Sequence, residues 1–120
     1  MIGWRLAKGR YADPPASAFD GEGSRRRGGR WSPPGTRVAY ASTSLALAAL
    51  EYFVNLDSGD APDGLVSIGL EIPDDVKVER IDIATLPSWS NLLISPAHPD
   101  FQRFAFSRPQ EFQFDARMWK

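Results

Sequence analysis

The sequence has 120 residues, of which 24% are charged and 42% are hydrophobic, a composition typical of one soluble globular domain. No apolar run approaches the roughly 20 residues of a membrane helix, and the first residues lack a secretory pattern, so we expect a cytoplasmic protein without membrane contacts. The absence of cysteine excludes disulfides and thiolate metal sites. A single histidine excludes a histidine-rich metal site, so we expect no metal.

The charge is distributed unevenly along the chain. Residues 1–40 contain eight Lys or Arg and three Asp or Glu, whereas residues 41–120 contain six and twelve. A basic N-terminal third suggests a phosphate-bearing ligand or nucleic acid. Alternatively, the two parts pair with each other across the fold. We expect no direct binding of nucleic acid, because the net charge is not basic and the arginine run lacks interleaved aromatic residues.

The first eleven residues predict a half-buried strand, because Ile2, Trp4 and Leu6 alternate with smaller or polar residues. Arg5 would then project to the face opposite Trp4 and Leu6. Residues 12–36 are dense in Gly, Pro, Ser and Arg, which predicts a long and mostly irregular loop. Its run of three consecutive arginines is typical of a solvated surface.

The end of this loop presents one arginine between two turns. Gly28 and Gly29 precede Arg30, and the proline and glycine residues of 33–35 follow it. A guanidinium held in this way is well placed to bind phosphate or carboxylate oxygens. The alternative is a surface loop in which the arginine has no such role.

A short strand is expected at residues 38–41 and a helix at 44–56, with the hydroxyl residues of 42–44 as N-caps. This helix is apolar on all sides, which predicts that it is buried.

Glu51 stands out because it lies on an apolar stripe of this helix, between Leu47 and Val54. Burying a carboxylate costs several kcal/mol unless it is paired. Glu51 is therefore either neutralised by an arginine or retained for chemistry, and we favour chemistry.

The second half of the chain predicts further strands. Residues 65–72 alternate clearly, with Val66, Ile68, Leu70 and Ile72 on one face. A polar turn at 57–63 precedes them, a turn follows at 73–75, and 76–83 predicts another strand. Residues 86–99 look irregular. We expect Phe101, Phe104 and Phe106 to pack in the core, and Phe112 and Phe114 to alternate in a last strand. The fold class is α+β: one domain over 1–120, with mostly antiparallel sheets flanked by short helices.

The polar residues most oddly placed against this apolar background are Arg5, Arg30, Tyr40 and Glu51. The sequence contains no nucleophilic triad, no closely spaced pair of carboxylates and no phosphate-binding glycine fingerprint after a strand. Arginines for a pyrophosphate, an aromatic ring for a flat base and one acid suit cleavage of the N-glycosidic bond of a nucleotide. A carboxylate stabilises the oxocarbenium-like cation that develops in such a reaction.

Several motifs, in this order and spacing, resemble the RES domain family over nearly the whole chain. They are Trp4-Arg5, Phe19-Asp20-Gly21-Glu22-Gly23, Gly28-Gly29-Arg30-Trp31, Val38-Ala39-Tyr40-Ala41-Ser42, Leu45-Ala46-Leu47-Ala48-Ala49-Leu50-Glu51 and Asn91-Leu92-Leu93-Ile94-Ser95-Pro96-Ala97-His98-Pro99-Asp100-Phe101. The resemblance implies a toxin of a bacterial type II toxin–antitoxin pair, with an Xre-like helix-turn-helix antitoxin as its partner in a hetero-oligomer. It also implies a fold similar to that of ADP-ribosylating toxins and an enzyme that consumes NAD⁺. The ADP-ribose would pass to water, to phosphate or to a target protein.

The resemblance also implies roles for individual residues. Arg5 and Arg30 would hold the phosphates or ribose of NAD⁺, and Tyr40 would pack on the nicotinamide side. Glu51 would orient the ribose hydroxyls or stabilise the cation, so that Glu51, Arg30 and Tyr40 form the catalytic set. Trp31 and Ser42 would complete the NAD⁺-binding set.

This chain departs from the family pattern in two places. Leu6 follows Arg5, where some members have tyrosine. The stretch near 86–91 is also shorter than in other members, by on the order of a few dozen residues. This is either a natural deletion or a loop missing from the sequence, and we favour the missing loop, which would leave a break in the chain. Ser88, Ser90 and Ser95 are the candidates for the serine of the family.

A second hypothesis belongs to a different class. The chain would then be a non-catalytic binding module that engages a helix-turn-helix antitoxin or a nucleic acid.

Overall fold

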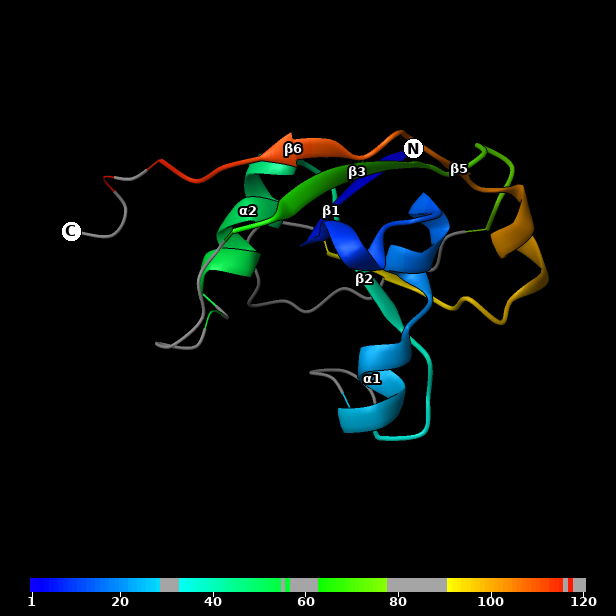
Figure 1. Cartoon of the computed structure of the whole chain (residues 1–120). Coiled ribbons are helices and arrows are strands. Elements are labelled where there is room, and N and C mark those ends of the chain that lie inside the picture. The colour runs from blue at the N-terminus through cyan, green and yellow to red at the C-terminus, as the bar shows by residue number, and fades with distance from the viewer. Residues whose placement is uncertain (29–32, 55, 57–62, 78–90, 116, 118–120) are drawn as a thin grey trace, which may run out of the picture.

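The computed structural model describes residues 1–28, 33–54, 56, 63–77, 91–115 and 117 (Figure 1). Its strands form one antiparallel sheet: β1 (Ile2–Lys8), β2 (Ala39–Ser42), β3 (Leu65–Glu71), β4 (Asn91–Ile94), β5 (Ala105–Phe106) and β6 (Gln110–Phe112). The helices are α1 (Glu22–Arg27) and α2 (Leu45–Val54), with short 3-10 turns η1 (Gly9–Tyr11), η2 (Pro15–Phe19) and η3 (Pro99–Arg103). The predicted α+β class and the antiparallel sheet are confirmed.

The sheet is built on the pairing of β1 with β3. The strand order is β4-β2-β1-β3-β5, and β6 also pairs with β3. The two central strands pair along their whole length, from Ile2 opposite Glu71 to Lys8 opposite Leu65. This continuous register keeps the side chains alternating, so Arg5 lies on the face opposite Trp4 and Leu6, as predicted.

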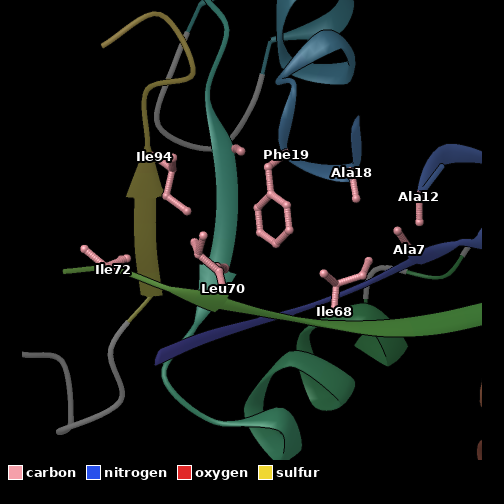
Figure 2. Packing of buried hydrophobic residues seen from close by; sticks show 10 residues of the cluster. Ala7, Ala12, Ala18, Phe19, Ile68, Leu70, Ile72 and Ile94 are labelled. Atoms are coloured by element: carbon pink, nitrogen blue, oxygen red, sulfur yellow. The ribbon is translucent and has the colours of Figure 1, made fainter. Parts of the chain in front are cut away.

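The main hydrophobic core lies on one face of the sheet and is closed by η2. Phe19, Ile68 and Leu70 are completely buried, and Ile94 joins them from β4 (Figure 2). The ring of Phe106 packs on that of Phe19, with 5.1 Å between the ring centroids. The other predicted core phenylalanines, Phe101 and Phe104, also pack against this cluster, so that prediction is confirmed.

Helix α2 lies on the other side of β1 and β3 from this core (Figure 2). The Oγ of Ser44 accepts a hydrogen bond from the backbone N–H of Leu47 at 3.1 Å, which confirms the predicted N-cap. The prediction of a helix buried on all sides was wrong, since Leu50 and Val54 are 46% and 63% exposed. The buried residue is Ala48, whose small side chain lets the helix approach the sheet closely.

Two segments that we predicted to be irregular contain regular structure. Residues 12–36 include η2 and α1, and residues 86–99 include strand β4, which pairs with β2 from Ala39 opposite Ile94 to Ser42 opposite Asn91. This pairing depends on a strand distant in sequence, so local composition did not reveal it.

The last predicted strand was too long. Strand β6 ends at Phe112, and Phe114 instead packs on the aromatic rings of α2, with its centroid 6.4 Å from that of Tyr52 and 5.9 Å from that of Phe53.

The predicted strand at 76–83 and the shortened stretch near 86–91 fall largely or wholly outside the described residues, as does most of the polar turn at 57–63.

Gly21 lies directly before α1, where the chain entering the helix passes close to the chain that returns from it. Gly21 has φ of +71°, and a Cβ at this position would lie 2.8 Å from the backbone N of Val38 and 2.9 Å from the carbonyl carbon of Arg37. Farther along, the N–H of Gly35 donates to the carbonyl of Arg25 at 2.7 Å. The chain therefore leaves and re-enters the sheet region at nearly the same point.

We predict that Gly21→Ala lowers the free energy of unfolding by at least about 1 kcal/mol, because alanine disfavours this positive φ and its Cβ would clash with backbone atoms. Urea unfolding would measure the change. Gly35→Ala is the control for φ alone, since Gly35 also has positive φ (+97°) but no atom within 4 Å of an added Cβ. Equal losses in the two variants would contradict the importance of the close approach.

Candidate functional site

Arg5 occupies the point where β1 and β2 separate. Strand β1 pairs with β2 through one register pair, Trp4 opposite Ser42, whereas β2 pairs with β4 over its whole length. Beyond that pair, the carbonyl of Tyr40 accepts a hydrogen bond from Nη1 of Arg5 at 2.7 Å. A side chain therefore replaces the backbone donor that a longer β1–β2 ladder would supply.

The surroundings of this guanidinium are unusual for a cation. Its Nε is buried and has no hydrogen-bond partner among the described residues, and no described carboxylate forms an ion pair with it. Burial lowers the pKa of Arg5, and the nearby Asp20 and Tyr52 partly offset this effect. A buried guanidinium nitrogen without an ion pair is costly, and groups with a perturbed pKa are found preferentially at functional sites.

Tyr40 and Ser42 are the predicted site residues of β2, the strand whose Tyr40 carbonyl accepts the hydrogen bond from Arg5. Ser42 is buried, at 4% exposed, and Tyr40 is half-buried. Their side chains alternate with those of Ala39 and Ala41, which belong to the main core, so they share the opposite face of the strand. The structure therefore brings the backbone carbonyl of Tyr40 to Arg5.

Helix α2 brings Glu51 toward the sheet. The helix packs against β1 and β2, and Glu51 lies one turn after the buried Ala48, so it is on the side that faces the sheet. The side chain of Arg5 lies on the opposite face of β1, together with Ile68 of the main core, so Glu51 approaches the sheet from the other side. Its side chain is half-buried. The stripe that we predicted around it is only partly correct, because the neighbouring Val54 points to solvent.

Two residues near Arg5 were not in the predicted set. Tyr52 and Asp20 both interact electrostatically with Arg5. Tyr52 directly follows Glu51 in α2. Its hydroxyl could have marked it as a candidate site residue, but its neighbours in the sequence made it look like one more apolar residue of the helix. Asp20 ends η2 and is held there by the buried Phe19.

Most of the other predicted site residues lie outside the described part of the chain. Arg30, Trp31, Ser88 and Ser90 lie outside the described residues. Ser95 is exposed in the turn that follows β4.

Three other arginines of the basic N-terminal third, Arg25, Arg26 and Arg37, gather around Glu22. The guanidinium of Arg25 donates to both carboxylate oxygens of Glu22, from Nε at 2.9 Å and from Nη2 at 2.5 Å. Nε of Arg26 donates at 2.9 Å, and Nη2 of Arg37 lies 3.0 Å from Oε2 of Glu22. Hydrogen bonds from Arg25 and Arg26 lower the pKa of Glu22 to about 2.

Pairing between the basic and acidic parts of the chain also occurs. Nζ of Lys8 lies 3.2 Å from the carboxylate of Asp63, and the N-terminal amine lies 3.5 Å from that of Asp74. The arginines around Glu22, in contrast, have their ion pairs within the N-terminal third.

Within the described ranges, no group of three or more acidic, histidine or cysteine residues is arranged to hold a metal ion. The helices in the same ranges are too short or too polar to cross a membrane.

These observations define an α+β domain with an arginine at the point where two strands of its sheet separate, and the Nε of this arginine is buried without a partner among the described residues. Residues 2–105 match the family model of the RES domain, and the chain belongs to this family. It is 28% identical to the "Prs ADP-ribosylating toxin" of Sphingobium sp. (strain YBL2), over 96% of this chain and 94% of that protein. It is 34% and 38% identical to proteins named "Toxin Res" from Photorhabdus laumondii and Pseudomonas putida, over 75% of this chain and 56% and 58% of theirs.

The alignment lengths show that relatives have residues that this chain lacks. The alignment with the Sphingobium protein spans 153 positions, and one with a "Toxin Res" of Yersinia enterocolitica spans 154, whereas this chain has 120 residues. Both alignments therefore contain positions at which this chain has no residue. That these positions fall near 86–91 stays a prediction.

We predict that the contribution of Glu22 to stability depends on acid pH. The folded-state pKa is depressed to about 2, so this contribution is present above the unfolded-state pKa, about 4.3, and is lost as the pH falls toward 2. Urea unfolding of wild type and Glu22→Gln at several pH values should give curves that differ at neutral pH and converge in acid. Glu111→Gln, at an exposed position without a described ion pair, is the control. A difference that does not shrink in acid would contradict the assignment.

We also predict that Arg5→Met changes the free energy of unfolding by less than about 1.5 kcal/mol. Removing a buried cation relieves its desolvation, which offsets the lost hydrogen bond to the Tyr40 carbonyl. Ile68→Ala, in the same sheet, should cost about 2–5 kcal/mol and is the control for core damage. A loss of about 3 kcal/mol or more in Arg5→Met, as when a buried salt bridge is broken, would show that Arg5 is structural.

Proposed function

We propose that this protein is a toxin that consumes NAD⁺ by cleaving the bond between nicotinamide and ribose. The ADP-ribose passes to water, to phosphate or to a target protein. The observation that carries the proposal is Arg5, a buried guanidinium with an unpartnered Nε and no described carboxylate partner. The printed name of the Sphingobium relative, an ADP-ribosylating toxin, supports the same chemistry.

Arg5 would bind the anionic part of the dinucleotide. Its Nη1 donates to the Tyr40 carbonyl, which restrains the plane of the guanidinium, and its Nε is buried without a partner among the described residues. A phosphate or ribose oxygen would supply that partner and the negative charge that the site lacks. Arg30, which lies between two predicted turns, would provide the second cationic contact.

Glu51 would act on the ribose. As the C1′–N1 bond breaks, its electron pair moves onto the pyridinium nitrogen, nicotinamide leaves neutral, and positive charge develops at C1′ and the ring oxygen. A half-buried carboxylate on α2 stabilises this charge or orients the ribose hydroxyls. Tyr40 would pack on the nicotinamide, and Trp31 and Ser42 would complete the binding site. No metal takes part in this scheme.

The partner in this proposal is a cognate antitoxin of the Xre type, which forms a hetero-oligomer with the toxin in the cytoplasm. Support for this comes from the relatives named as toxins and from the family resemblance of the motifs. The protein that receives ADP-ribose, if the acceptor is a protein, is not indicated by any described residue.

We expect purified protein to release nicotinamide from NAD⁺, and this release to fall at least about 100-fold in Glu51→Gln and in Arg5→Lys. Glutamine removes the charge that stabilises the cation. Lysine keeps the charge of Arg5 but loses the planar fork that reaches both the Tyr40 carbonyl and the ligand. Chromatography of nicotinamide and ADP-ribose, with and without added phosphate, measures the reaction and names the acceptor.

The control is Glu71→Gln, which removes an exposed carboxylate from the end of β3 and should leave turnover unchanged. Nicotinamide release that requires phosphate would indicate phosphorolysis, and release only with added cell protein would indicate ADP-ribosylation of a target. Absence of turnover under all three conditions, with a folded protein, would contradict the proposal and favour a non-catalytic binding module.

A further inference from the structure

A compact group of four exposed arginines lies on and beside α1. This arginine cluster consists of Arg25, Arg26, Arg27 and Arg37. The side chains of Arg25 and Arg37 are 43% and 44% exposed, and that of Arg26 is 70% exposed. All members of the cluster are exposed to solvent, in contrast to Arg5, whose Nε is buried.

The cluster carries more positive charge than its own acids neutralise. Arg25, Arg26 and Arg37 contact the carboxylate of Glu22. The four arginines of the cluster exceed the two acids of this segment, Asp20 and Glu22, by two charges. Glu22 engages only Nε of Arg26, so the outer nitrogens of that fork remain available. The side chain of Arg27 forms no hydrogen bond or ion pair with the other described residues. This surface therefore has guanidinium N–H donors that are not used within the cluster and an excess of positive charge.

The positions of Arg25, Arg26 and Arg37 are fixed by the structure around them. Glu22 joins Arg25 and Arg26 of the helix to Arg37 of the returning chain, and the guanidinium of Arg37 also donates to the carbonyl of Asp20 at 3.2 Å. The close approach at Gly21 brings the two chain segments together. Less side-chain entropy is then lost on binding than for arginines on an unconstrained loop.

The chemistry of the surface selects among anionic partners. Planar guanidinium forks match carboxylates in a two-point geometry, and Glu22 already binds Arg25 in this way. Described residues of 20–28 and 33–38 include no aromatic side chain on which a base could stack. Helix α1 has six residues and is about 9 Å long, which suits two or three carboxylates of a peptide better than an extended phosphate backbone.

We propose that the arginine cluster is a docking surface for an acidic segment of a partner protein, bound through carboxylate contacts to Arg26 and Arg27. This surface does not depend on NAD⁺ chemistry, so the proposal stands apart from the proposed activity. In a toxin held by a partner protein, it would add electrostatic attraction to the association.

The test uses a fluorescein-labelled peptide in which glutamate alternates with serine, and its counterpart with glutamine in place of glutamate. We expect the full chain to bind the glutamate peptide at low salt, measured by fluorescence anisotropy, and to bind the glutamine peptide much more weakly. The double variant Arg26→Gln/Arg27→Gln should raise the Kd about fivefold, as expected for two exposed ion pairs. Added salt should remove the difference.

The matched control is Arg10→Gln/Arg108→Gln, which removes the same charge from exposed positions outside the cluster. An equal rise in Kd in this control would overturn the proposal, because overall charge would then explain the binding. Tighter binding of a thymidine oligonucleotide, lost in the same cluster variant, would overturn it in favour of nucleic acid. Failure of the glutamate peptide to bind at low salt would also overturn it.

Two further measurements keep these outcomes interpretable. The single variant Arg27→Glu alters a side chain without a described partner, so it should weaken the peptide without unfolding the protein. Nicotinamide release by the cluster variants should match that of wild type, so loss of peptide binding and absence of NAD⁺ turnover would be separate results.

Discussion

The pairing of β1 with β3 is the constraint on which the rest of the structure depends. It joins residues near the start of the chain to a strand more than fifty residues away, along the full length of both strands. Strand β2 is attached to it through β1, and β5 and β6 through β3. Because both faces of this pair are covered, by the main core on one side and by α2 on the other, a one-residue slip in register would expose both (Figure 2).

This constraint also explains how a cation comes to be buried. Arg5 lies in the middle of β1, so its backbone position is fixed by the ladder with β3, and its side chain must be accommodated where it emerges. The separation of β2 from β1 after Trp4 and Ser42 creates that space, and the Tyr40 carbonyl faces it. A buried cation lowers local stability, so we expect that a functional requirement explains why Arg5 is retained at this position.

The elements that the sequence predicted are those that local chemistry determines. Strand β3 follows from strict alternation and α2 from its N-cap serine and helix-favouring residues, and Arg5 was correctly singled out as a polar residue in an apolar setting. Strand β4 was not predicted because its extended conformation depends on pairing with β2, which is distant in the sequence. The buried side of α2 was also misjudged, because a helix with apolar residues on all sides does not reveal that Ala48 will face the sheet. Tyr52 and Asp20 approach Arg5 only in the folded chain, so neither spacing nor composition pointed to them.

The unpartnered Nε of Arg5 has a consequence for the lifetime of the protein. A ligand that supplies the missing partner binds only the folded state, so it stabilises that state in proportion to the logarithm of its concentration. If that ligand is NAD⁺ and the proposed activity holds, each turnover removes some of the protein's own stabiliser. The fraction of unfolded, protease-sensitive chains would then rise as the nucleotide is depleted, which makes the activity self-limiting.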